Sequence, residues 1–263
     1  MNEQQARAAI IEVGKLLYQK SYVVSSDGNV SVRLDDGRIL ATPTQVSKGR
    51  MSEDMLALTD LDGKPLNDRR ASSELAMHLL IYRERADVQS VVHAHPPHGT
   101  AFAVAGLAID APILSEVILT LGCVPLTAYG TPSTSELTRE MQPFVKHHNA
   151  LLMANHGAVA YGADIWQAFD RMETLEHTAK IAILAKTLGE PQNLPASAIE
   201  KLIEIREKAG YLTGSARCQA CGYLSETNVT CDARETNGNS NGAKKTLTRD
   251  ELIELLSNAV GPR

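Results

Sequence analysis

Three histidines beside two apolar segments are the residues whose types and spacing best fit catalytic chemistry. His93 and His95 follow two valines and precede two prolines, and His156 follows the apolar run 150–154. Side chains two apart on a strand point to the same face, so His93 and His95 can converge on one point. Three imidazoles that leave a fourth position open are typical of catalytic zinc. The alternative for His156 is a hydrogen-bonded histidine in a turn.

The other five histidines fit such a site less well. His78 falls on a predicted helix face, His147 and His148 in a helix-to-strand turn, and His177 in a long helix. We expect each of these four to be structural or solvated. His98 is close to the site in sequence, but the start of a helix there can turn its side chain away.

Glu74 follows Ser72 and Ser73 at a predicted helix start, where either serine is a suitable N-cap. Carboxylates are common at helix N-termini because the helix dipole favours them, which is the structural interpretation. The functional interpretation is that this helix end offers backbone N–H groups and hydroxyls to a phosphate. The turn segments 28–29 and 42–45 carry further hydrogen-bond donors.

The elements that must position these residues alternate between strands and helices. The first two strands form a predicted hairpin around Asp35-Asp36-Gly37, and Gly189 closes the last long helix. This order predicts an α/β domain with a mixed sheet covered by helices. Periodicity predicts helices over 3–20, from 72 or 73 past 82, 99–105, 113–121, 135–146 and 164–188, and strands over 30–34, 38–41, 55–59, 91–95, 125–129, 150–154 and 158–161.

Composition excludes several classes of protein. Hydrophobic residues make up 43% of the 263 residues and charged residues 22%, which is ordinary for a soluble globular protein. A net charge of -5 and a pI near 5.9 give no basic footprint for nucleic acid or an anionic membrane. No apolar run approaches the roughly 20 residues that span a bilayer, and the N-terminus lacks a signal peptide. We therefore expect a cytoplasmic protein without nucleic-acid or membrane partners.

Taken together, the motifs resemble the class II aldolase/adducin family, typified by L-fuculose-1-phosphate aldolase. The resemblance covers about residues 5–190 and implies a three-layer α/β/α fold with a central mixed, largely antiparallel sheet. It also implies a homotetramer with active sites between subunits, and a divalent metal, usually zinc. Five motifs in the family's order carry the resemblance: Gly28-Asn29-Val30-Ser31, Thr42-Pro43-Thr44, Ser72-Ser73-Glu74, His93-Ala94-His95 and Asn155-His156-Gly157.

By this resemblance, His93, His95 and His156 are the metal ligands and Glu74 is the catalytic acid/base. Asn29, Thr44, Ser72 and Ser73 would bind the substrate phosphate.

Two positions depart from the family. Gln45 stands where fuculose-phosphate aldolase has a glycine, and Glu116 is close to the position of a tyrosine that the neighbouring subunit supplies. Glu116 is either a substitute for that tyrosine, which deprotonates the C4 hydroxyl, or an ordinary helix carboxylate, which we favour slightly.

The resemblance implies cleavage of a deoxyketose 1-phosphate, of the L-fuculose or L-rhamnulose type, to dihydroxyacetone phosphate and lactaldehyde. A methylthioribulose-1-phosphate dehydratase or a decarboxylase of the same fold is the enzymatic alternative. A pentulose-phosphate epimerase is less favoured, because that branch has aspartate where Glu74 stands. A non-catalytic adducin-like interaction module is disfavoured, because a scaffold has no use for an open metal site.

The C-terminal part of the sequence differs in character from residues 1–210, the expected catalytic domain. Residues 211–246 are an expected flexible linker in which Cys218, Cys221 and Cys231 lack the fourth ligand of a zinc ribbon, so free thiols are favoured. Residues 247–263 carry one apolar stripe and resemble the encapsulation peptides that bind bacterial microcompartment shell proteins. The alternative is a helix that packs on its own tetramer.

Overall fold

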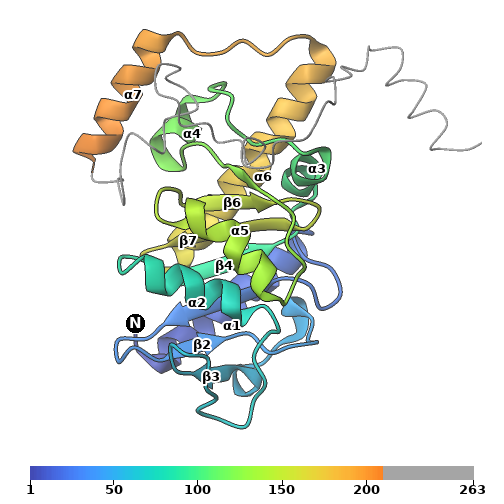
Figure 1. Ribbon diagram of the computed structural model, residues 1–263, viewed down its shortest axis with the longest axis vertical. Helices are drawn as coiled ribbons and strands as arrows, with labels where there is room; N and C mark the ends of the chain where they lie inside the picture. The colour runs from blue at the N-terminus through green and yellow to red at the C-terminus, as the bar shows by residue number, and fades with distance from the viewer. Residues whose placement is uncertain (210–263) are drawn as a thin grey trace, which may run out of the picture.

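A seven-stranded sheet runs through residues 1–209, the part of the chain that this computed structural model describes (Figure 1). The strand order is β3-β2-β1-β4-β7-β6-β5, and only the β5–β6 pair is parallel. The expectation of a mixed, largely antiparallel sheet is therefore confirmed. The strands are β1 Asn29–Arg33, β2 Ile39–Ala41, β3 Ala57–Thr59, β4 Ser90–Ala94, β5 Leu126–Thr127, β6 Ala150–Met153 and β7 Gly157–Gly162.

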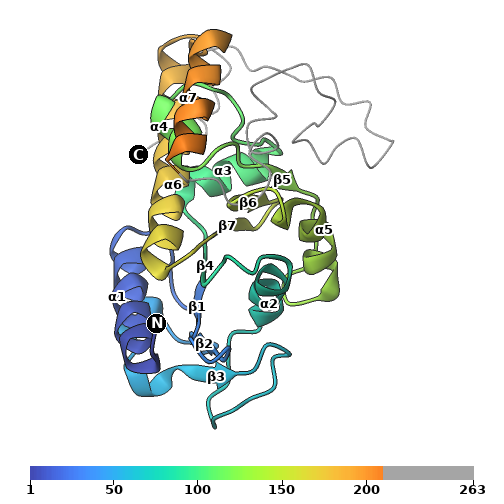
Figure 2. The ribbon, with the colours of Figure 1, turned by 90° about the vertical axis from the view of Figure 1, so that its left-hand side faces the viewer.

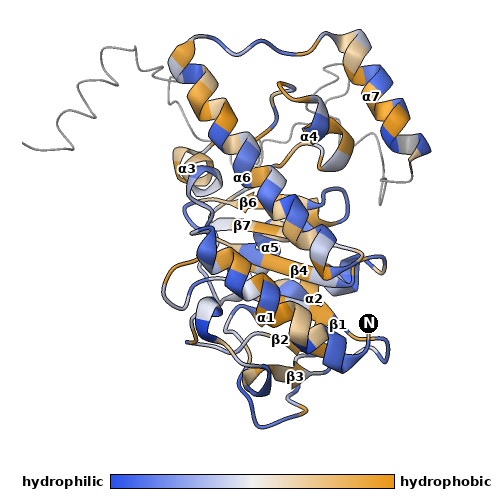
Figure 3. Ribbon diagram, turned by 180° about the vertical axis from the view of Figure 1, so that it is seen from behind, coloured by the Kyte–Doolittle hydropathy of each residue, from blue (hydrophilic) through white to orange (hydrophobic). Residues whose placement is uncertain are grey.

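Helices cover both faces of the sheet, which confirms the three-layer α/β/α arrangement. Helices α1 and α6 lie on one side of the strands, and α2 and α5 lie on the other (Figure 2). The strands are largely hydrophobic, whereas α1 and α6 alternate between hydrophobic and hydrophilic residues (Figure 3). The helices are α1 Glu3–Gln19, α2 Leu75–Glu84, α3 Pro97–Ala105, α4 Ser115–Thr120, α5 Ser135–Val145, α6 Ile165–Leu188 and α7 Ala196–Lys208.

The sheet has two cores because successive side chains of a strand point to opposite faces. In β4, Val92 and Ala94 join the core beneath α1 and α6, whereas Val91 joins the core beneath α2 and α5. In β1, Val30 and Val32 also face α1 and α6. The same alternation places His93 on the α2 face of the sheet.

Helix α7 was not expected, although its sequence carries a signal. Ile199, Leu202, Ile203 and Arg206 recur at helical spacing. Ile199, Leu202 and Ile203 form a small core with Ile118 of α4, and the buried Arg206 donates to the carbonyls of Ile118 (3.0 Å) and Leu121 (3.2 Å). Because α7 is stabilised by packing on α4, about 80 residues earlier in the chain, its local sequence alone did not suffice to predict it.

Two local expectations are wrong. Residues 53–55 form a short 3-10 turn, so β3 begins at Ala57 and not at residue 55. Helix α2 has Glu74 as its N-cap, without a side-chain cap bond. Ser72 accepts the Glu74 N–H through its hydroxyl (3.3 Å) and the Leu75 N–H through its carbonyl (3.1 Å), so it forms a turn before the helix.

Among residues 1–209, no helix is long and apolar enough to cross a membrane. The expected linker over 211–246 and the expected helix over 247–263 lie outside the described residues.

Candidate metal centre and active site

The sheet brings the two histidine motifs together through the pairing of β4 with β7. His93 pairs with Val159 of β7, and β7 follows directly from the 154–156 turn that carries His156. Strand β4 ends at Ala94, and Pro97 begins α3, which leaves His95 on the connection between them. The ends of β4 and β6 therefore place three imidazoles side by side.

The three imidazoles are arranged with nearly threefold symmetry. Their ring centroids are 5.0 Å (His93–His95), 4.8 Å (His93–His156) and 5.2 Å (His95–His156) apart, with interplanar angles of 67°, 62° and 65°. One ligand atom from each residue lies within 4.8 Å of the others. This is the arrangement that three imidazoles adopt around a single ion.

The hydrogen bonds of the ring nitrogens indicate which nitrogens keep a lone pair, and these lone pairs face one another, as they would around a bound cation. His93 Nδ1 lies 2.9 Å from the Ala158 carbonyl and can only be its donor, which leaves the lone pair on Nε2. His93 Nε2 is 3.2 Å from His95 Nε2, close to the separation of about 3.3 Å between two nitrogens on tetrahedral zinc.

The Nδ1 atoms of His95 and His156 also bear on whether the cluster can hold a cation. His95 Nδ1 lies 3.6 Å from the Asp27 carboxylate, which favours a proton on Nδ1 and a second lone pair in the cluster. His156 Nδ1 is buried without a hydrogen-bond partner among the described residues. A divalent cation fits this donor set, because it would accept lone pairs that otherwise face one another.

Glu74 lies against the same cluster. Its carboxylate oxygens are 3.3 Å from His93 Nε2 and 3.2 Å from His156 Nε2, and its side chain is 12% exposed. Burial acts to raise the pKa of Glu74, but positive charge on the neighbouring His93 and His156 rings outweighs burial and holds this pKa well below its usual range. A divalent cation held by the neutral rings would supply the same positive charge beside the carboxylate. Burial, followed by the neighbouring His93 and His156, lowers the pKa of His95 to about 3. The site thus holds an ionised carboxylate and a neutral imidazole.

Two glycines of the family-like motifs are required by close packing around the histidines. A Cβ on Gly157 would lie 2.5 Å from His95 Cδ2 and 2.7 Å from the Ala94 carbonyl. Gly28 has a φ of +71°, and a Cβ there would lie 2.8 Å from the His93 carbonyl. Both positions exclude side chains.

The segments expected to bind phosphate also lie together. Pro43 pairs with Ala71 in an isolated antiparallel bridge. Two backbone hydrogen bonds of 3.1 Å flank this bridge: the Thr44 N–H donates to the Arg70 carbonyl, and the Ser72 N–H donates to the Thr42 carbonyl. This antiparallel bridge holds the segment that contains Thr44 against the segment that contains Ser72 and Ser73, with Thr42 opposite Ser72 and Thr44 opposite Arg70. The Val30 N–H donates to Thr42 Oγ1 (3.1 Å), which joins Asn29 and its strand to the same region.

The two departures from the family are placed differently. Gln45 is exposed and has a φ of +59°, a left-handed conformation that glycine adopts more readily. Glu116 is exposed on α4, and its carboxylate forms no hydrogen bond or ion pair with residues 1–209. Within one chain, Glu116 is not brought into contact with the histidine cluster.

Several neighbours of the site were not expected from the sequence. Asp27 lies behind His95, and the buried Lys48 donates to the carbonyls of Ser26 and Val46, both at 2.8 Å. His78, expected to be structural or solvated, is buried and donates to Asn29 Oδ1. A signal existed for His78, because it stands four residues after Glu74 on one helix face.

His98 is turned toward helix α6 and does not join the cluster. Its ring Nδ1 lies 2.6 Å from a carboxylate oxygen of the buried Glu176, which also accepts the Gly99 N–H at 2.8 Å. His98 therefore ties the start of α3 to α6.

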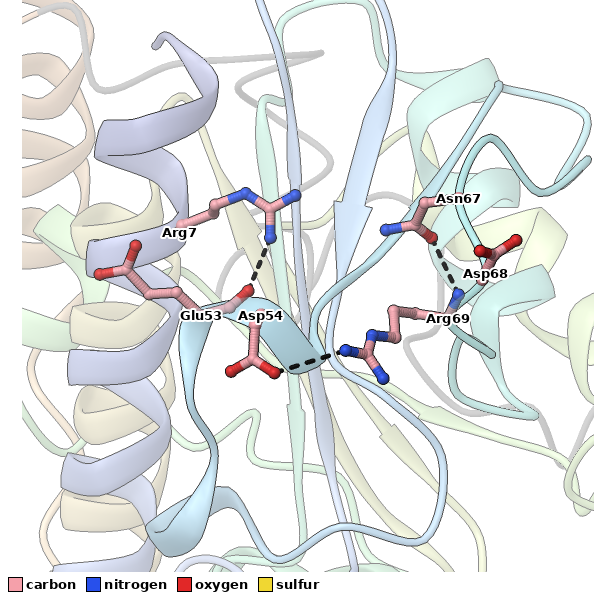
Figure 4. Close-up of a pocket in the computed structure, with 6 residues that line it drawn as sticks. All are labelled: Arg7, Glu53, Asp54, Asn67, Asp68 and Arg69. Carbon is pink, nitrogen blue, oxygen red and sulfur yellow. Dashed lines mark hydrogen bonds and ion pairs between the residues drawn. The ribbon is translucent and has the colours of Figure 1, made fainter.

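A separate cavity of about 620 Å³ lies beside α1, away from these residues (Figure 4). Arg7 donates to the Glu53 carbonyl (2.6 Å), and Arg69 forms an ion pair with Asp54 (3.4 Å). None of the histidine-site residues lines this cavity, so it is not part of the metal centre. Its lining residues are Arg7, Glu53, Asp54, Asn67, Asp68 and Arg69.

Comparison with known proteins identifies relatives of this chain. Residues 8–183 match the family described as Class II Aldolase and Adducin N-terminal domain. The chain is 35% identical over 187 residues to 3-oxo-tetronate 4-phosphate decarboxylase of Pectobacterium atrosepticum, an alignment that covers 70% of this chain and 86% of that protein. It is 30% identical over 213 residues to 5-deoxy-D-ribulose 1-phosphate aldolase of Bacillus thuringiensis, covering 79% and 98%. A solved structure of L-fuculose 1-phosphate aldolase is similar with a TM-score of 0.72 and 28% identity, covering 77% of this chain and 96% of that chain.

Proposed function

Because this chain belongs to the class II aldolase and adducin N-terminal domain family, we propose that it cleaves a carbon–carbon bond of a phosphorylated ketose. The substrate that we propose is a deoxyketose 1-phosphate of the L-fuculose or L-rhamnulose type, with dihydroxyacetone phosphate and lactaldehyde as products. The observation that carries this proposal is the convergence of His93, His95 and His156 on one point, with the Glu74 carboxylate in contact with His93 and His156.

His93, His95 and His156 would hold the divalent ion, for which zinc fits three imidazoles with an open position. When bound, the ion supplies Lewis-acid stabilisation of negative charge on the substrate oxygens, so no Schiff-base lysine is needed. When the C3–C4 bond breaks, the C4 hydroxyl gives up its proton and becomes the aldehyde carbonyl, and the bonding electron pair stays on C3. The net result is one proton moved from the C4 hydroxyl to C3, and Glu74, after taking up a proton, is the group that delivers it to C3. Its contacts of 3.2–3.3 Å with two of the imidazoles support this role, because they put the carboxylate beside the proposed metal site.

The substrate phosphate is assigned to the hydroxyls and N–H groups of the adjoining segments. Thr44, Ser72 and Ser73 supply neutral donors, and Asn29 supplies an amide. The bridge between Pro43 and Ala71 supports this assignment, because it sets the two hydroxyl-bearing loops side by side.

A decarboxylase is the second candidate, and one observation favours it. The relative that is 35% identical is named 3-oxo-tetronate 4-phosphate decarboxylase. Loss of carbon dioxide from a 3-oxo acid leaves its electron pair in the same kind of oxygen-stabilised carbanion, and it needs no base for a C4 hydroxyl.

A substrate panel separates these candidates. The purified full-length protein is assayed for dihydroxyacetone phosphate across ketose 1-phosphates, and for carbon dioxide release from 3-oxo-tetronate 4-phosphate. Dihydroxyacetone phosphate from the deoxyketose 1-phosphates supports the first proposal, and carbon dioxide release without it supports the second. If metal-loaded protein is inactive in both assays, the adducin-like interaction module becomes the better interpretation.

We further propose a homotetramer, with residues 247–263 binding a microcompartment shell protein. The resemblance stated for the sequence supports both proposals, and a cytoplasmic or microcompartment-lumen location goes with them.

A further inference from the structure

We propose that His78 is a positioning residue that fixes the orientation of the Asn29 amide, and through it the Glu74 carboxylate. It acts within a one-directional chain of hydrogen bonds from Tyr82 through Ser31, His78 and Asn29 to Glu74. This inference rests on the proposed function only in taking Glu74 as the acid/base.

The chain exists because a strand face and a helix face meet. Asn29 and Ser31 stand two apart on β1 and therefore point to the same side of the sheet. Glu74, His78 and Tyr82 recur every four residues at the start of and along α2, so they share one face of the helix. The core between the sheet and α2 joins these two polar rows.

Each contact along the rows is a hydrogen bond. Ser31 Oγ lies 2.7 Å from Tyr82 Oη and 2.7 Å from His78 Nδ1. His78 Nε2 contacts Asn29 Oδ1, and Asn29 Nδ2 donates to Glu74 Oε2 at 3.0 Å. Asn29, Ser31, His78 and Tyr82 are each at most 2% exposed, so water does not substitute for a missing member.

The direction of these bonds follows from the orientation of the Asn29 amide. Its NH₂ group donates to Glu74, so its carbonyl oxygen, which can only accept, faces His78. His78 must then carry its proton on Nε2, and its Nδ1 accepts from the Ser31 hydroxyl. Because the single hydroxyl proton of Ser31 is donated to His78, Ser31 Oγ accepts the hydrogen bond from the Tyr82 hydroxyl. Burial lowers the pKa of His78 to about 3, so the ring is neutral and has a single N–H.

A proton on His78 Nε2 thus holds the Asn29 amide in this orientation, because only the amide oxygen can accept it. If the amide were reversed while His78 kept this proton, the amide oxygen would lie beside the Glu74 carboxylate and the NH₂ group would meet the His78 N–H. Both contacts would be repulsive. With the observed orientation, the second N–H of the Asn29 amide is left over for an anionic group of the substrate.

The tautomer of His78 is a direct test that does not depend on activity. Full-length protein labelled with ¹⁵N-histidine is examined by long-range ¹H–¹⁵N correlation spectroscopy at neutral pH, and His78 is assigned by the loss of its signals in His78→Gln. We expect a neutral ring protonated on Nε2. A ring protonated on Nδ1, or on both nitrogens, would overturn the proposal.

Two variants test whether the N–H or only the ring is needed. His78→Phe keeps a ring of similar shape but cannot donate, whereas His78→Gln loses the ring and keeps a donor that can reach Asn29. We expect kcat to fall about tenfold to a hundredfold in His78→Phe, the range seen when a supporting hydrogen bond is lost, and less in His78→Gln. Purely structural packing predicts the opposite order, and finding that order would contradict the proposal.

The controls separate this inference from the proposed function. His177→Gln makes the same substitution at an exposed position on α6 and is expected to leave kcat unchanged. Bound metal per subunit and thermal unfolding are measured for each variant to exclude loss of the site or the fold. If the wild-type protein lacks lyase activity, the proposed function fails, and the His78 tautomer still decides whether the chain exists.

Discussion

At the scale of single residues, the site brings three imidazoles and one carboxylate together in a partly buried cluster. The three imidazoles offer lone pairs to one point, and the Glu74 carboxylate remains ionised beside them. Neutral imidazoles and an ionised carboxylate are the states that metal binding and proton abstraction need.

We expect the purified protein to contain about one zinc-type divalent ion per subunit, because the nitrogen separation of 3.2 Å matches a shared ion. Elemental analysis of the protein measures this. Removal of the ion by a chelator should abolish turnover, and readdition of zinc should restore it. A metal-free protein that is unaffected by chelators would refute the metal centre.

We expect Glu74→Gln to keep the metal and lose about 10²- to 10⁴-fold in kcat, the usual contribution of a general acid/base. The amide has nearly the same shape but cannot take a proton. Steady-state kinetics and metal analysis of the same sample check this prediction. Unchanged turnover would remove Glu74 from its proposed role.

Lys48 makes stability depend on pH. Its burial lowers its pKa from 10.5 to about 8, although nearby Asp27 and Glu74 act to raise it. Between pH 8 and 10.5 the unfolded chain therefore binds more protons than the folded chain, so this residue's contribution to stability rises with pH. Relative to Lys48→Met, the wild-type free energy of unfolding should gain up to about 3 kcal/mol over this range. Denaturant unfolding at both pH values measures the gain, and a difference that is constant with pH would contradict it.

At the scale of elements, the β6–β7 turn packs so closely against the end of β4 that no Cβ can be accommodated at Gly157. Gly157 lets the His95 ring lie directly against the backbone that follows His156. The positions of His95 and His156, two of the proposed metal ligands, are thus coupled to how closely these two segments approach.

We expect Gly157→Ala to weaken metal binding about tenfold or more and to destabilise the fold by about 1–3 kcal/mol, because a methyl group would displace His95. Metal titration and thermal unfolding measure the two effects. Gly189→Ala is the matched control, since a Cβ at Gly189 has no neighbour within 4 Å. Wild-type metal affinity in Gly157→Ala would show that the turn tolerates the displacement.

At the scale of the whole molecule, residues 1–209 contain the three-layer fold and the three histidines proposed to bind a metal. We therefore propose that catalysis does not need the C-terminal segment. The proposed shell binding depends on that segment alone.

We expect deletion of residues 240–263 to leave kcat and thermal stability close to their wild-type values and to abolish co-localisation with a microcompartment shell. Activity assays and fluorescence imaging of tagged full-length and truncated proteins measure the two effects. Loss of folding in the truncated protein would favour packing of this segment on its own tetramer.

Much of the fold and site could be predicted because short stretches of sequence indicate both. The alternation of apolar and polar residues over 30–34 predicts a strand, and the apolar stripe over 3–20 predicts a helix, each from neighbouring residues alone. The motifs around Asn29, Glu74, His93 and His156 could likewise be identified by type and spacing, and the structure brings those residues together.

The sequence by itself determined which residues could do chemistry, and the tertiary structure decided what surrounds them. Asp27 behind His95, the buried Lys48 and the packing of α7 on α4 each join residues far apart in the chain. Such contacts depend on strand register and on which helix face meets the sheet, and neither is a property of a short segment. His78 shows the difference: its spacing from Glu74 was visible, but only the register of β1 opposite α2 gave it Asn29 and Ser31 as partners.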